Sequence, residues 1–98
     1  VVLSLGLTYD ATPEDIEKSL VLLDEIAQRN AAIIEPETPK GFTTFGDFAL
    51  GVTFVYYIKK DADIMDTQTK MHLDILKTFN ANGLEFAFPT QTVYKKEL

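Results

Sequence analysis

Few side chains in this sequence could bind a metal ion or carry out acid–base chemistry. His72 is the only histidine among the 98 residues, and cysteine is absent, which excludes disulfides, thiolate chemistry and cysteine zinc sites. A metal site on a helix would need further ligands three or four residues from His72, where Ile75 and Leu76 stand instead. We therefore interpret His72 as a residue of the rim or the core, and we expect neither a metal ion nor a cofactor.

A group of three carboxylates, Asp61, Asp63 and Asp66, invites comparison with a calcium-binding loop. Such a loop needs glycine at its sixth position and glutamate at its twelfth. Counting from Asp61, the sequence has Asp66 and His72 at these positions. Capping of a following helix by Asp61 or Asp63 explains the group better.

Signatures of the common enzyme classes are also missing. Ser4 and Ser19 do not lie in a Gly-x-Ser-x-Gly motif, and the five glycines are too dispersed to form a phosphate-binding loop. The only arginine, Arg29, lies where a helix is expected to end rather than in an anion-binding loop. We therefore do not expect an enzyme, and a cryptic enzyme remains only a third alternative.

The composition limits the partners. Hydrophobic residues make up 46% and charged residues 24%, as in an ordinary globular domain, and the net charge is −6. An acidic domain lacks the basic surface that nucleic acid or anionic lipid requires. No stretch approaches the roughly 20 apolar residues that span a bilayer. The chain opens with Val1 inside an apolar segment, so we interpret it as a piece of a longer protein that reaches a membrane only through upstream segments.

The first half of the sequence predicts a strand and a helix. Apolar and other residues alternate from Val1 to Thr8, which is typical of a strand with one apolar face. Thr12 is a good N-cap and Pro13 fits the first helical position. Apolar residues at helical spacing then predict a helix that runs from about Pro13 to Arg29 or Asn30.

The second half predicts a hairpin, a helix and a last strand. Two apolar runs, 41–45 and 50–58, flank a Gly-Asp turn. A second helix follows and ends at Gly83, with the next residue packing back as in a Schellman motif. Residues 84–88 alternate as a strand, and Pro89 stops it.

The resulting order is that of a ferredoxin-like β-α-β-β-α-β fold of the α+β class. Right-handed crossovers place two helices on one face of a four-stranded antiparallel sheet. We expect this domain to cover residues 1–89 and to be followed by a tail, residues 90–98. The open face of the sheet is only half polar, so we expect a neighbouring copy or another domain to cover it.

Four segments, in order, resemble the C-terminal domain of the MscS-like (small-conductance mechanosensitive) channel family. They are Leu-Gly-Leu-Thr-Tyr-Asp-Ala-Thr-Pro-Glu-Asp-Ile-Glu-Lys at 5–18, Phe-Gly-Asp-Phe-Ala-Leu with the strand at 45–58, Phe-Asn-Ala-Asn-Gly-Leu at 79–84, and Phe-Ala-Phe-Pro-Thr-Gln-Thr-Val at 86–93. The resemblance covers nearly the whole chain. Phe48, Ala87 and Thr90 depart from the family pattern, which has small polar residues, proline and glutamine there.

The resemblance implies a vestibule domain on the cytoplasmic side of the bacterial inner membrane. Seven copies would form a cage that admits ions and small solutes, and the tail would add to a small β-barrel on the axis. The pore and the tension sensor would lie upstream. We therefore expect a homo-oligomer interface at these residues: Val2, Thr53, Val55, Tyr57, Thr92, Val93 and Tyr94.

The alternative is a ferredoxin-like regulatory module that binds a small molecule. Such modules often bind ligand at a glycine-containing loop between the first strand and the first helix. Here that loop, residues 9–13, has no glycine and is typical of a helix cap instead.

Overall fold

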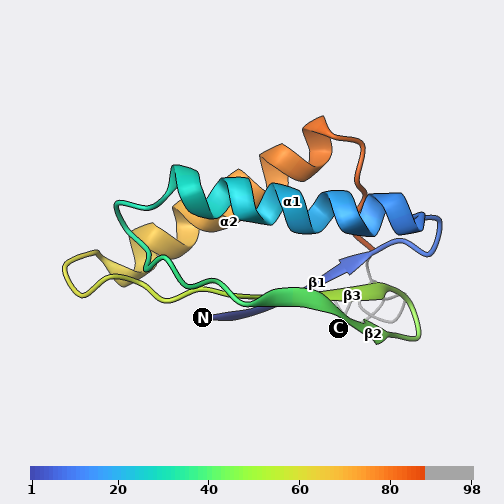
Figure 1. Cartoon of the computed structure of the whole chain (residues 1–98), viewed down its shortest axis with the longest axis horizontal. Helices are drawn as coiled ribbons and strands as arrows, with labels where there is room; N and C mark the ends of the chain where they lie inside the picture. The colour runs from blue at the N-terminus through green and yellow to red at the C-terminus, as the bar shows by residue number, and fades with distance from the viewer. Residues whose placement is uncertain (88–98) are drawn as a thin grey trace, which may run out of the picture.

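The computed structural model describes residues 1–87. Along the chain come β1 (Val2–Leu7), α1 (Pro13–Arg29), β2 (Lys40–Phe45), β3 (Leu50–Val55) and α2 (Ile64–Ala81). The strands form one antiparallel sheet in the order β1-β3-β2, and both helices lie on the same side of it (Figure 1). The α+β class and the single helix layer therefore agree with the expectation from the sequence.

The predicted last strand lies only partly within the described residues. Phe86 forms an isolated antiparallel bridge with Leu7, and Ala87 donates its backbone N–H to the carbonyl of Gly6 at 2.9 Å. Among residues 1–87 these contacts do not make a strand, so the sheet has three strands where four were expected. The rest of the predicted strand lies outside the described residues.

The long strand of the hairpin is shorter than predicted. It was expected to reach Ile58, but β3 ends at Val55. Tyr56 still donates its N–H to the carbonyl of Val1 at 3.0 Å, but after it the backbone changes partner, because Tyr57 accepts a hydrogen bond from the N–H of Glu35 at 2.8 Å and Ile58 bridges Ile34. The chain after Tyr56 is therefore tied to the connection between α1 and β2 rather than to the sheet.

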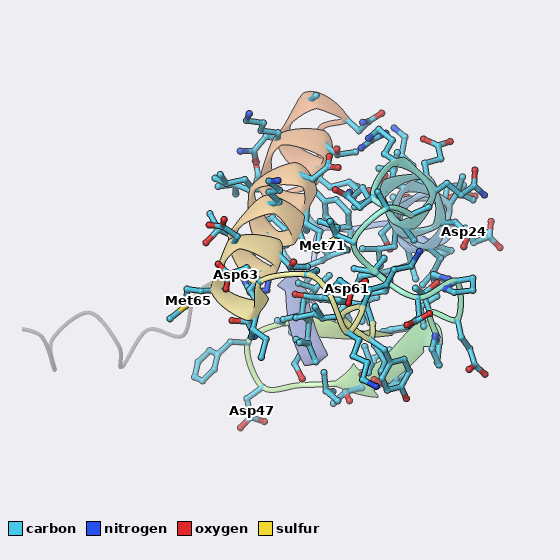
Figure 2. All side chains as sticks on the ribbon, turned by 90° about the vertical axis from the view of Figure 1, so that its left-hand side faces the viewer. Asp24, Asp47, Asp61, Asp63, Met65 and Met71 are labelled. Carbon is cyan, nitrogen blue, oxygen red and sulfur yellow. The ribbon has the colours of Figure 1, made fainter. Side chains whose placement is uncertain are left out.

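The core fills the space between the sheet and the two helices. Its buried apolar residues are Leu7, Ile16, Leu22, Leu23, Ile26, Ile34, Leu50, Val52, Phe54, Tyr56, Met71, Ile75, Phe79 and Leu84. Every second residue of β3 contributes to it, which is the alternation that a sheet with one covered face requires. Figure 2 shows Met71 pointing inward from α2, whereas Met65 points outward and is 73% exposed.

Thr12 is the N-cap of α1, as the sequence predicted, and it forms a capping box with Asp15. The Thr12 hydroxyl accepts a hydrogen bond from the N–H of Asp15 at 3.1 Å, and the Asp15 carboxylate accepts one from the N–H of Thr12 at 3.0 Å. Pro13 occupies the first turn, where its missing N–H is no loss. Two N–H groups that the helix cannot use are thereby satisfied.

The end of α2 is a Schellman motif, also as predicted. Gly83 has φ +75°, and its N–H donates to the carbonyl of Asn80 at 3.2 Å. The N–H of Leu84 donates to the carbonyl of Phe79 at 3.0 Å, and the Leu84 side chain is buried. This ending turns the chain back toward the sheet at the outer edge of β1.

Replacing Gly83 by alanine tests this ending. Because a Cβ disfavours the left-handed conformation, Gly83→Ala is expected to lower the free energy of unfolding by about 1 kcal/mol in urea denaturation. Gly41→Ala is the matched control, since Gly41 has no positive φ and an added Cβ meets nothing closer than 4.0 Å. Equal losses in both variants would contradict a specific role for the left-handed residue.

Candidate functional site

His72 lies on the exposed flank of α2, beside a buried hydroxyl. The Tyr56 side chain is fully buried, and its hydroxyl lies 3.5 Å from Nε2 of His72. Burial raises the pKa of the Tyr56 hydroxyl above its ordinary value. The imidazole therefore serves as the polar partner of a core tyrosine, at the rim where the core meets solvent.

The carboxylates around the start of α2 do not cap it through their side chains. Asp63 occupies the N-cap position, but its carboxylate makes no capping hydrogen bond, so the predicted role for this residue is wrong in that respect. Figure 2 shows Asp63 at the beginning of α2, with Asp61 in the preceding loop. Asp66 in the first turn lies near the positive end of the helix dipole. All three carboxylates are exposed to solvent.

Two other kinds of site are absent from residues 1–87. No cluster of three histidine or acidic side chains is placed to hold a metal ion within this part of the chain. Neither α1 nor α2 combines the length and hydropathy needed to cross a bilayer. The surfaces of the domain are therefore the remaining candidates for function.

The structure brings Val2, Thr53 and Val55, three of the predicted interface residues, together on the open face of the sheet, and Tyr57 follows two residues after the end of β3. Val2 of β1 is directly opposite Val55 of β3, with Thr53 two residues away on the same face. Val2 is 69% and Tyr57 49% exposed, whereas Thr53 and Val55 are half-buried. The other predicted residues, 92–94, lie outside the described residues.

A shallow groove of about 260 Å³ continues this open face toward the hairpin. Its walls carry hydroxyl groups, and Oγ1 of Thr43 lies 2.7 Å from Oγ1 of Thr53. Gly51 forms part of the groove, and a Cβ on it would lie 3.0 Å from Cβ of Thr44. The open face thus has an apolar half and a hydroxyl-lined half.

Aromatic residues on β2 form a second surface, which the sequence reasoning missed. Phe42 pairs with Val52 and Phe45 with Leu50, so both rings lie on the helix-covered side. A β-bulge between them allows two residues three apart to share a face. The rings contact edge to face at 5.0 Å, and Phe45 is 78% exposed. With the start of α1 they border an apolar groove of about 430 Å³.

Comparison with known proteins gives the family. Residues 1–86 match the sequence model described as "Mechanosensitive ion channel MscS, C-terminal". The chain belongs to this family. It is an MscS C-terminal domain, as the resemblance indicated.

Relatives of this MscS domain include two channels of Methanocaldococcus jannaschii. The "Large-conductance mechanosensitive channel MscMJLR" is 32% identical over 98 residues, and the "Small-conductance mechanosensitive channel MscMJ" is 29% identical over 96 residues. The alignments cover 95% and 96% of this chain but 27% of each relative. An "Uncharacterized MscS family protein" of Aquifex aeolicus is 24% identical over 97 residues. The chain therefore spans about a quarter of the length of these relatives.

A polar cluster joins the two helices of this MscS domain. Nη2 of Arg29 lies 2.7 Å from Oδ1 of Asp74 and 2.9 Å from Oγ1 of Thr78, and the amide of Asn30 donates to Oδ2 of Asp74 at 3.0 Å. Burial raises the pKa of the Asp74 carboxyl, but the hydrogen bonds from Arg29, Asn30 and Thr78 together hold that pKa below its ordinary value. The cluster fixes the end of α1 against the middle of α2.

Neutralising Asp74 tests this cluster. Asp74→Asn is expected to lower the free energy of unfolding at pH 7 by about 1 kcal/mol, because the partly exposed pair is screened by water. A pKa that is lowered in the folded state gives stability above the unfolded value and loses it as the pH falls. The variant should therefore lose less stability than the parent chain below about pH 4. Asp10→Asn, an exposed acid, is the control; identical acid profiles for parent and Asp74→Asn would contradict the assignment.

Proposed function

We propose that this MscS C-terminal domain builds part of the cytoplasmic vestibule of an oligomeric mechanosensitive channel. In this proposal seven copies form a cage on the inner side of the cell membrane, and ions and small solutes reach the pore through it. The family match over residues 1–86 carries the proposal, because it covers nearly all of the described chain. The pore would be formed by other parts of the longer protein.

The charge distribution supports assembly through the open face of the sheet. The chain has 15 acidic and 9 basic residues, so most of its surfaces would repel a second copy. The residues of β1 and β3 that point away from the helices carry no charge; they are Val2, Ser4, Gly6, Gly51, Thr53 and Val55. This face can therefore meet a neighbour without like-charge repulsion. We propose Val2, Thr53, Val55 and Tyr57, together with Thr92, Val93 and Tyr94, as the interface.

We also propose that the complete fold is ferredoxin-like. The strand order β1-β3-β2 is the order that three strands of this topology have, and the Leu7–Phe86 bridge lies where the fourth strand would start. The regulatory-module alternative finds less support, because the loop before α1 is taken up by the capping box.

A charge on the open face tests the assembly proposal. In the channel that carries this domain, Val55→Arg is expected to weaken the oligomer by roughly tenfold or more, since an unpaired buried charge costs about 2 kcal/mol or more. Val21→Arg on α1, where Val21 is 57% exposed, is the matched control. Native mass spectrometry of the purified channel measures the oligomer, and thermal unfolding of the 98-residue variant separates misfolding from lost assembly. An unchanged oligomer in a folded Val55→Arg variant would refute this interface.

The acidic side chains should favour cations in the vestibule. Replacing Asp61, Asp63 and Asp66 by asparagine is therefore expected to lower the cation-to-anion permeability ratio of the open channel, measured in patches under membrane tension. Glu14, Glu17 and Glu25 changed to glutamine give a control with the same loss of charge on α1. Unchanged selectivity in the aspartate variant would contradict the proposed electrostatic role.

A further inference from the structure

An apolar groove of about 430 Å³ lies between the outer strand β2 and the start of α1 (Figure 1). Its wall includes Pro13, Ile16 and Leu50 beside the two phenylalanine rings of β2. Phe42 and Phe45 are both exposed, although they lie on the side of the sheet that the helices cover. The groove is therefore an accessible apolar surface within the described part of the chain.

The backbone of β2 presents hydrogen-bonding groups beside this groove. At one end of the strand the N–H of Val55 donates to the carbonyl of Pro39 at 2.8 Å, and at the other end the N–H of Gly46 donates across the hairpin turn at 2.8 Å. Residues of an antiparallel pair alternate between bonding to the partner strand and pointing their N–H and C=O groups away from it. Counted from these two ends, Phe42 and Phe45 point their backbone groups away from β3. A further strand can therefore pair at the same residues whose rings border the groove.

The edge of β2 has little protection against such pairing. Outer strands are usually protected by charged side chains, by proline or by a bulge. Lys40 is the only charged residue of β2, and its Nζ lies 2.9 Å from a carboxylate oxygen of Asp24 on α1. The β-bulge after Phe42 interrupts regular pairing. The edge is therefore suited to a short partner strand rather than to a long one.

The charges around the groove are acidic. Glu17 forms part of its wall, exposed Glu14 lies one turn earlier on α1, and Asp47 lies in the hairpin turn that follows β2 (Figure 2). Lys18 follows Glu17 in the sequence, but its Nζ donates to the carbonyl of Asn82 at 3.3 Å. The surroundings of the groove therefore attract a cation and disfavour a second copy of this acidic chain.

We propose that the groove and the edge of β2 bind a short, basic, extended segment of another protein. The segment adds a strand to β2, and its alternate side chains point into the groove. An apolar residue lies opposite Phe42, and a lysine or arginine two residues away reaches Glu17. The proposal does not rest on the vestibule role, because it uses only the geometry and charges of this domain. The site also leaves the open face of the sheet free for a neighbouring copy.

A synthetic peptide, acetyl-Thr-Lys-Thr-Phe-Thr-Lys-Thr-amide, provides the probe. In NMR titrations of the isotope-labelled 98-residue chain, it is expected to shift the amide signals of residues 41–45 and of the start of α1. The same peptide with glutamate in place of lysine should bind about tenfold more weakly or worse, since it loses the charge-assisted contacts. N-methylation of its phenylalanine removes the N–H that pairs with β2 and should weaken binding about fivefold. Equal binding of the three peptides, or signal shifts elsewhere in the domain, would overturn the proposal.

Variants of the domain test the two contacts separately. Phe45→Ser and Glu17→Lys should each weaken binding of the lysine peptide about tenfold, and Glu17→Lys should also bring a preference for the glutamate peptide. Met65→Ser, at another exposed apolar residue, and Asp61→Lys, in the loop before α2, are the matched controls and should bind as the parent chain does. Thermal unfolding checks that each variant is folded. Unchanged binding in a folded Phe45→Ser or Glu17→Lys variant would contradict the site.

Three further outcomes would assign the groove to a different occupant. Dimers in sedimentation velocity that Phe45→Ser dissociates would show that a second copy fills it. Peptide binding that becomes about tenfold stronger in the double variant Tyr94→Ser with Lys95→Ser would show that the chain's own tail competes for it. A purified channel that does not bind the peptide, although the 98-residue chain does, would show that another part of the channel occupies it. Each of these results overturns the proposal, whereas equal binding by channel and chain supports it.

Discussion

Burial of one face of β3 is the interaction on which the domain depends. β3 lies at the centre of the sheet, hydrogen-bonded to β1 on one side and to β2 on the other, and Val52, Phe54 and the following Tyr56 are fully buried. The hydrophobic side chains of both helices pack on this face. A three-stranded sheet needs such a covered face to be stable, because pairing of its strands alone is marginal. The covering layer in turn leaves the other face of the sheet uncovered among the described residues.

The parts of the fold that local chemistry determines could be predicted from the sequence. Thr12 and Pro13 define a helix start, and Gly83 defines a helix end, through contacts within a few residues. The end of β3 was missed because the alternation of buried residues continues through Tyr56, and the backbone changes its partner only after that residue. That change depends on Ile34, which lies far away in sequence. Side-chain periodicity reports burial and does not report which strand accepts the hydrogen bonds.

The candidate surfaces also differ in whether the sequence alone could predict them. Val2 and Val55 could be assigned to one face because strand side chains alternate strictly with a period of two. Phe42 and Phe45 could not, because the bulge between them breaks that period, and a bulge is decided by the pairing rather than by residue type. The pairing of Arg29 with Asp74 was likewise missed, since the crossing of two helices determines which of several acids the single arginine meets.

Charge and apolar surface together restrict how such a domain can associate. A chain of net charge −6 gains little from contact through its helices or its charged loops, where acids would face acids. Among residues 1–87, apolar side chains dominate the aromatic groove at β2 and the cleft beside β1, and the open sheet face carries no charge. The open sheet face and the aromatic groove lie on opposite sides of the sheet, because Phe42 and Phe45 share the helix side. Contacts through the open face would leave the helices and their acids facing solvent. The excess of acids that opposes other contacts would then give the assembly a negatively charged surface.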